Sequence, residues 1–160
     1  MRHDQQGFSL IELLIVVAII LIIAAIAIPN FMRSRVAANQ ASAIESLRVI
    51  SSAEVTYSTT YGTGYSTTLA LLAPPASGQT VNSTAAGLID EVLAGGYKSG
   101  YSFFYTPTLI SGGTINGYML VANPSTYGTT GGVYYYTDQS FVITANSTQQ
   151  ASSTDSPVGD

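Results

Sequence analysis

An apolar run near the N-terminus restricts what this chain can fold into more than any other feature. It extends from Phe8 to Ile28, and Glu12 is the only charged residue inside it. As an α-helix this run would be about 31 Å long, which is enough to cross a bilayer. An ionised carboxylate at the centre of such a segment costs about 2.5–3.5 kcal/mol, and less near an end. We therefore expect Glu12 to have a partner and a function.

A second helical pattern follows the apolar run. Pro29 removes one backbone donor and predicts a kink or a local break. Beyond it, apolar residues recur every three or four positions, as an amphipathic helix requires: Ala37, Ala41, Ile44, Leu47, Ile50, Ala53 and Tyr57. Gly62 and Gly64 are expected to end this helix. A helix of about 50 residues, roughly 80 Å long, cannot be buried in a small head, so lipid or copies of the same helix must cover its first half.

The rest of the chain reads as a small head with strands. Residues 88–94 predict a short helix, and residues 101–105, 118–122, 133–136 and 140–143 predict strands. Thr137-Asp138-Gln139 is expected to form a tight hairpin turn between the last two strands. These patterns predict an α+β fold, in which one long N-terminal α-helix packs against a small antiparallel β-sheet of about four strands. Residues 146–160 have almost nothing to bury and are expected to be a disordered tail.

The N-terminal residues resemble a known family. Gln5-Gln6-Gly7-Phe8-Ser9-Leu10-Ile11-Glu12-Leu13 is similar to the class III signal of type IV prepilins and related pseudopilins, and the similarity extends to Arg35. The resemblance implies the pilin fold of a short-leader, type IVa-like prepilin. It implies a leader at 1–7, a transmembrane and filament-core segment at 8–30, and a globular head at 31–145. It also implies that a prepilin peptidase cuts between Gly7 and Phe8 and methylates the new N-terminal amine of Phe8.

The function implied by this resemblance is polymerisation. The chain would be a structural subunit of a type IV pilus, assembled through its apolar helix, with Phe8, Glu12 and Pro29 as assembly residues. Glu12 would pair with the free amine of Phe8 on a neighbouring subunit. The expected partners are other copies of the chain, the inner membrane, the prepilin peptidase and the pilus assembly machinery. The precursor would cross the inner membrane once, and the mature protein would lie in an extracellular pilus. A type II secretion pseudopilin is the nearest alternative, and a minor pilin is the next.

Two simpler interpretations of the N-terminus remain open. A plain membrane anchor explains the apolar run but leaves Gly7, Phe8 and Glu12 without a role. A secretory signal is suggested by Ala25-Ile26-Ala27, which fits an A-x-A cleavage site, but the apolar region exceeds the usual 7–15 residues and contains an acid. The positive-inside rule does not decide the orientation, because Arg33 and Arg35 follow the span.

The chain contains few of the residue types that commonly act in catalysis. The chain has no cysteine, and its only histidine, His3, lies in the expected leader. A mature chain without either residue has no His-based triad and no His/Cys metal site. We therefore expect no enzyme activity, no metal and no cofactor. The net charge of −4 and the absence of a basic stripe argue against direct nucleic-acid binding.

Other polar motifs have ordinary explanations. Asp90-Glu91 fits a solvated helix face, because adjacent helix residues point apart. Asp138 could suggest a calcium ligand, but a turn aspartate that bonds its own backbone is commoner. Asn82-Ser83-Thr84 and Asn146-Ser147-Thr148 match the N-glycosylation sequon, a triplet that also arises by chance in Ser/Thr-rich sequence.

Overall fold

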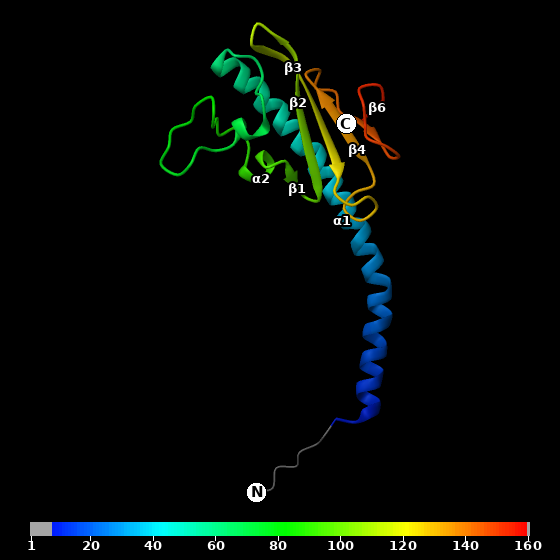
Figure 1. The fold of residues 1–160 in the computed structure, drawn as a ribbon. Helices are drawn as coiled ribbons and strands as arrows, with labels where there is room; N and C mark the ends of the chain where they lie inside the picture. Colours follow the sequence, from blue (N-terminus) through cyan, green and yellow to red (C-terminus); the bar gives the residue numbers. More distant parts are fainter. Residues whose placement is uncertain (1–7, 160) are drawn as a thin grey trace. The chain divides into compact units, whose positions relative to one another are not determined.

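The computed structural model describes residues 8–159 and shows a long helix followed by an antiparallel sheet (Figure 1). The helices are α1 (Leu10–Tyr61), the 3-10 helix η1 (Leu69–Leu72) and α2 (Glu91–Ala94). The strands are β1 (Tyr97–Lys98), β2 (Tyr101–Ser111), β3 (Thr114–Pro124), β4 (Tyr134–Asp138), β5 (Thr144–Asn146) and β6 (Ser156–Pro157). Each strand pairs with the next along the chain, in one antiparallel sheet. The predicted α+β class, with a long N-terminal helix and an antiparallel sheet, is confirmed.

Helix α1 is 52 residues long and runs through Pro29 without a break. The expected local break is therefore wrong, because the loss of one backbone donor leaves the other bonds of the helix in place. Asn30 adds a side-chain bond in the same turn, from its Nδ2 to the Ile26 carbonyl at 3.1 Å. The helix ends where predicted, at Gly62, whose φ of +67° suits a residue without a side chain. The chain divides into two compact units between Arg35 and Val36.

The core of the head lies between the C-terminal part of α1 and one face of the sheet. The buried helix residues are Ala43, Leu47, Ile50, Ala53 and Tyr57. The sheet contributes Tyr101, Phe103, Tyr118, Leu120, Ala122 and Tyr135, and the connecting segments contribute Leu69, Leu72, Ile89 and Leu93. The predicted apolar stripe is thus correct from Ile44, which is partly buried against the core, to Tyr57, whereas Ala37 and Ala41 stay exposed.

The predicted fourth strand at 140–143 is wrong. Phe141 has a φ of +64°, in the left-handed region, so these residues form the turn that leads into β5. Asp138 explains the turn: its Oδ1 accepts a hydrogen bond from the Ser140 N–H at 2.8 Å, and its carbonyl accepts one from the Phe141 N–H at 3.0 Å. This local bonding competes with strand pairing, although the side chains of 140–143 are typical of a strand.

The C-terminal segment is ordered, in contrast to the expected disordered tail. Thr144 pairs with Pro157 and Ala145 with Ser156, which adds β6 to the sheet. Asp155 accepts hydrogen bonds from the Ser152 N–H at 2.7 Å and from Asn146 Nδ2 at 2.9 Å. Hydrogen bonds from polar side chains, and not the burial of apolar ones, hold this segment in place.

Helix α2 is shorter than predicted, because Asp90 caps it by accepting from the Leu93 N–H at 2.9 Å.

Candidate assembly surface

The N-terminal part of α1 exposes apolar side chains on every side. From Phe8 to Met32 no residue is buried, and the exposed fraction is 87% for Phe8, 61% for Leu14 and 66% for Phe31. This is the blue part of the helix in Figure 1. Within residues 8–159, α1 is the one helix that is long and apolar enough to cross a membrane, by length and composition. A helix that is apolar all round needs lipid or other protein around it.

Glu12 lies at the start of this helix and caps it. Its Oε2 accepts a hydrogen bond from the Ser9 N–H at 2.9 Å. Ser9 precedes the first helical residue, Leu10, and its carbonyl accepts a bond from the Leu13 N–H at 3.3 Å. This is the acid's half of a capping box, in which the third helical residue bonds the backbone N–H of the capping residue.

Sequence reasoning missed this capping role. The signal was present, because Ser9-Leu10-Ile11-Glu12 matches the S-x-x-E pattern before an apolar run. Glu12 therefore has a role within its own subunit, besides the contact between subunits that the resemblance implies. Any substitution test must separate the two roles.

The structure brings only some of the expected site residues together. Phe8 lies just before α1 and Glu12 lies in its first turn, while Pro29 lies about 25 Å beyond Glu12 along the helix axis. Pro29 has no N–H, so the Ala25 carbonyl lacks its usual helical donor. That carbonyl is a polar group in the apolar run, at the end opposite Glu12. Gly7 lies outside the described residues, and so does the leader, including His3.

A second acid, Glu54, is buried in the head and was not predicted. Its side chain is fully buried, and it accepts bonds from the Ser66 N–H at 2.8 Å and the Ser66 hydroxyl at 2.6 Å. The Tyr105 hydroxyl donates to the Ser66 carbonyl at 2.9 Å. Burial raises the pKa of Glu54 above its ordinary value, and the hydrogen bonds from Ser66 oppose this shift. The available signal was its position on the buried stripe, four residues after Ile50 and three before Tyr57.

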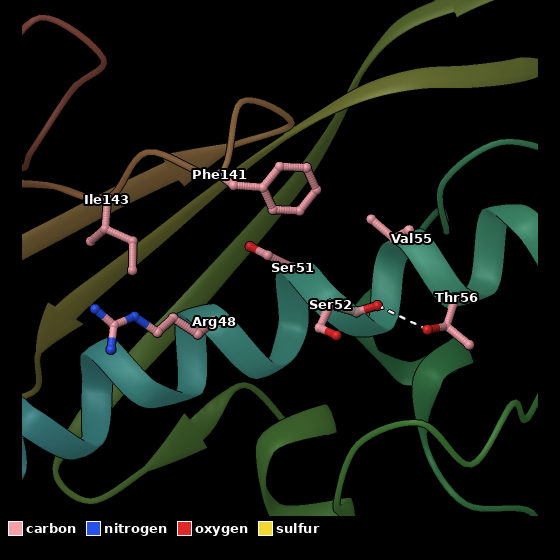
Figure 2. Close-up of a pocket in the computed structure, with 7 residues that line it drawn as sticks. All are labelled: Arg48, Ser51, Ser52, Val55, Thr56, Phe141 and Ile143. Atoms are coloured by element: carbon pink, nitrogen blue, oxygen red, sulfur yellow. Dashed lines mark hydrogen bonds between the residues drawn. The ribbon is translucent and has the colours of Figure 1, made fainter. Parts of the chain in front are cut away.

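A hollow of about 380 Å³ lies beside α1 in the head (Figure 2). Phe141 and Ile143, from the turn before β5, form one wall, and the other residues come from α1: Arg48, Ser51, Ser52, Val55 and Thr56. The figure shows the Thr56 hydroxyl donating to the Ser52 carbonyl, at 3.0 Å. The lining has no histidine, cysteine or acid. Within residues 8–159, no group of three or more His, Cys, Asp or Glu residues could hold a metal ion.

Comparison with known proteins agrees with the features of the N-terminus. Residues 2–28 match the family described as the prokaryotic N-terminal methylation motif. The type IV major pilin protein PilA of Myxococcus xanthus (strain DK1622) is 48% identical over 53 residues, which are 33% of this chain and 24% of that protein. The match thus spans about a quarter of that relative's length, and no solved structure matches this chain. The methylation motif and the likeness to a type IV major pilin thus each cover only a part of this chain, and both accompany a long apolar N-terminal helix.

Proposed function

We propose that the chain is a filament-forming pilin subunit that polymerises through the exposed apolar part of α1. The observation that carries this proposal is that no residue from Phe8 to Met32 is buried. Burying one large apolar side chain contributes about 1.5–3 kcal/mol, so a helix with this many exposed ones is strongly stabilised by any apolar surroundings. Lipid covers the helix in the precursor, and helices of other copies cover it in the filament.

In this proposal the precursor crosses the inner membrane once, and a prepilin peptidase removes residues 1–7 and methylates Phe8. The assembly machinery then moves the subunit from lipid into the filament. Intact mass spectrometry of protein from native cells should show the loss of the leader and the gain of one methyl group. A mature N-terminus at Ile28 would instead support cleavage as a secretory signal.

Glu12 is proposed to guide docking through its charge. Cleavage leaves an amine on Phe8, close to the start of α1, and the carboxylate of an incoming subunit can pair with it. In an apolar core, removing one member of such a pair typically costs about 3–5 kcal/mol, because the remaining charge stays buried without a partner. Of the two oxygens of the Glu12 carboxylate, Oε2 is the one that accepts the capping bond from the Ser9 N–H.

Two substitutions separate docking from capping. Glu12→Gln keeps an oxygen that can accept from the Ser9 N–H, since Gln also serves in capping boxes, but it removes the charge. Glu12→Ala removes both the acceptor and the charge. If pairing with the Phe8 amine drives assembly, both variants should be processed, remain in the inner membrane and yield few or no filaments, as measured by shearing cells and quantifying the sheared protein.

Each alternative gives a different result in the same assay. Filaments from Glu12→Gln but not from Glu12→Ala would show that the cap, not the charge, is required. Normal filament yield from both variants would contradict the pairing mechanism. If the wild-type protein stays in the envelope, and its deletion blocks secretion while surface filaments persist, the chain is a type II secretion pseudopilin.

A further inference from the structure

We propose that Asn82 is a glycosylation site, which accepts a sugar on its side-chain nitrogen from a lipid-linked diphosphate donor. Asn82 lies in the loop between η1 and α2, drawn in green in Figure 1. Residues 76–84 of this loop are all exposed. The base of the loop is fixed by bonds from the Ala86 N–H to the Leu71 carbonyl and from the Leu88 N–H to the Leu72 carbonyl, both 2.8 Å. The loop therefore presents its tip to solvent from a fixed base.

The Asn82-Ser83-Thr84 triplet lies in a tight turn within this exposed loop. The turn is closed by the Asn82 N–H bond to the Ala85 carbonyl and by the reciprocal bond, both 3.1 Å. It is also tied to the head, because the Tyr57 hydroxyl donates to the Ser83 carbonyl at 2.8 Å. An enzyme that modifies the triplet thus meets one defined conformation.

The bonds made by the Asn82 side chain orient its nitrogen. The carbonyl oxygen, Oδ1, accepts from the Thr84 N–H at 2.8 Å and from the Thr84 hydroxyl at 2.7 Å, which uses both of its lone pairs. The nitrogen, Nδ2, donates one of its two N–H groups to the Thr80 carbonyl in a long bond of 3.3 Å. The oxygen is thus fully used, whereas the nitrogen is held by one long bond and is the end of the side chain open to modification.

The second triplet, Asn146-Ser147-Thr148, provides an internal comparison. Its Asn146 Oδ1 accepts from the Thr148 N–H at 2.9 Å and from the Thr148 hydroxyl at 3.0 Å, as in the first triplet. However, Asn146 is half-buried at the end of β5, and its Nδ2 donates to the Asp155 carboxylate at 2.9 Å. The two triplets match in sequence and in local bonding, but Asn82 lies on an exposed loop with its nitrogen in one long bond, whereas the Asn146 nitrogen is bonded to a carboxylate.

The reaction is a group transfer with no change of oxidation state. Asn82 Nδ2 forms a bond to C1 of the sugar, while the bond from C1 to the phosphate oxygen of the donor breaks. The lipid diphosphate leaves with the bonding pair, and one amide proton passes to a base of the transferase. The hydroxyl at position 84 is the group that the sequon rule requires two residues after the asparagine.

Peptide mapping by mass spectrometry, on full-length protein from native cells, tests the proposal. The peptide containing Asn82 should carry a sugar mass, and the peptide containing Asn146 should not. Asn82→Gln should abolish the added mass, and so should Thr84→Ala, which leaves the asparagine in place. Thr84→Ser keeps the hydroxyl and should retain it, and Asn146→Gln is the matched control that should change nothing.

Three results would overturn the proposal. The first is an Asn82 peptide found only unmodified, and the second is equal modification of Asn146. The third is a sugar mass that persists in Asn82→Gln, because the sugar would then be on another residue. All four substitutions lie at exposed or half-exposed positions, and circular dichroism of each variant confirms that the head is folded.

Discussion

At the scale of single residues, Glu54 is the most unusual side chain of the head. It is fully buried, and the groups that donate to it are neutral: the Ser66 N–H and the Ser66 hydroxyl. A buried carboxylate held only by neutral donors is costly when ionised. Burial accordingly raises the pKa of Glu54, and the nearby acid adds to the effect of burial in raising the pKa of Tyr105. Glu54 thus connects α1 to Ser66 through hydrogen bonds, at the energetic cost of burying a carboxyl group.

This arrangement predicts how the stability of the head depends on pH. Below the ordinary Glu pKa of 4.5 the carboxyl is protonated in both the folded and the unfolded chain, and its contribution to stability is fully present. As pH rises through the raised folded pKa, that stability is lost, because the unfolded state ionises more easily. Glu54→Gln should remove this decline in urea midpoints between pH 4.5 and pH 8. Glu45→Gln, on the exposed face of the same helix, should keep the wild-type decline, and an unchanged decline in Glu54→Gln would contradict the assignment.

At the scale of elements, the loop between β3 and β4 depends on close contact with a buried tyrosine. Tyr101 is fully buried, and its hydroxyl donates to the Val133 carbonyl at 2.9 Å. A side chain at Gly131 would overlap the ring and hydroxyl of Tyr101. At the next residue, Gly132, the nearest atom to an added Cβ is Gln40 Nε2 at 3.8 Å, which is ordinary contact. Neither glycine has a positive φ, so space alone distinguishes them.

The pair Gly131→Ala and Gly132→Ala tests this packing. Overpacking a well-filled core usually costs about 1–3 kcal/mol, and we expect that loss in the free energy of unfolding for Gly131→Ala. Gly132→Ala should lie within about 0.5 kcal/mol of wild type, because its added Cβ meets no atom closer than ordinary contact. Urea denaturation of the two variants measures both values. Equal stability would show that the loop yields without cost and that Tyr101 does not fix it.

At the scale of the whole molecule, the chain divides into two units that need different surroundings. Every residue of the hydrophobic core, from Ala43 to Ile143, lies in the unit that begins at Val36. In the described part of the unit before it, residues 8–35, the apolar side chains are exposed and none belongs to the core. We therefore expect the head to be stable in water alone, whereas the apolar part of α1 needs lipid or other protein around it.

A fragment of residues 36–160 should therefore be a soluble monomer. It keeps the complete core and the sheet, and it lacks the proposed assembly surface. Circular dichroism should show mixed helix and sheet, and size-exclusion chromatography should show one monomeric species that forms no filaments. An unfolded fragment would contradict the division of the chain, and native-like filaments from it would contradict the proposed role of the apolar helix.

The parts of the fold that could be predicted from sequence are those that local chemistry decides. The apolar run, the stripe from Ile44 to Tyr57 and the helix end at Gly62 each follow from spacing or from a single residue type. The capping role of Glu12 belongs to the same class, because its pattern spans only four residues. Residues 140–143 show the limit of this approach: their apolar side chains suit a strand, but the hydrogen bonds of Asp138 turn the chain instead.

By itself, the sequence determined that the chain has a long helix with an apolar N-terminal half, an acid in its first turn and a sheet-forming head. Each of these depends on contacts between residues close in the chain. Only the tertiary structure decided that Glu54 is buried, that residues 144–157 extend the sheet, and that Asn82 is exposed while Asn146 is held by Asp155. The physical reason is that burial and hydrogen bonding of these polar groups depend on partners distant in the sequence or in a neighbouring strand, which no local pattern specifies.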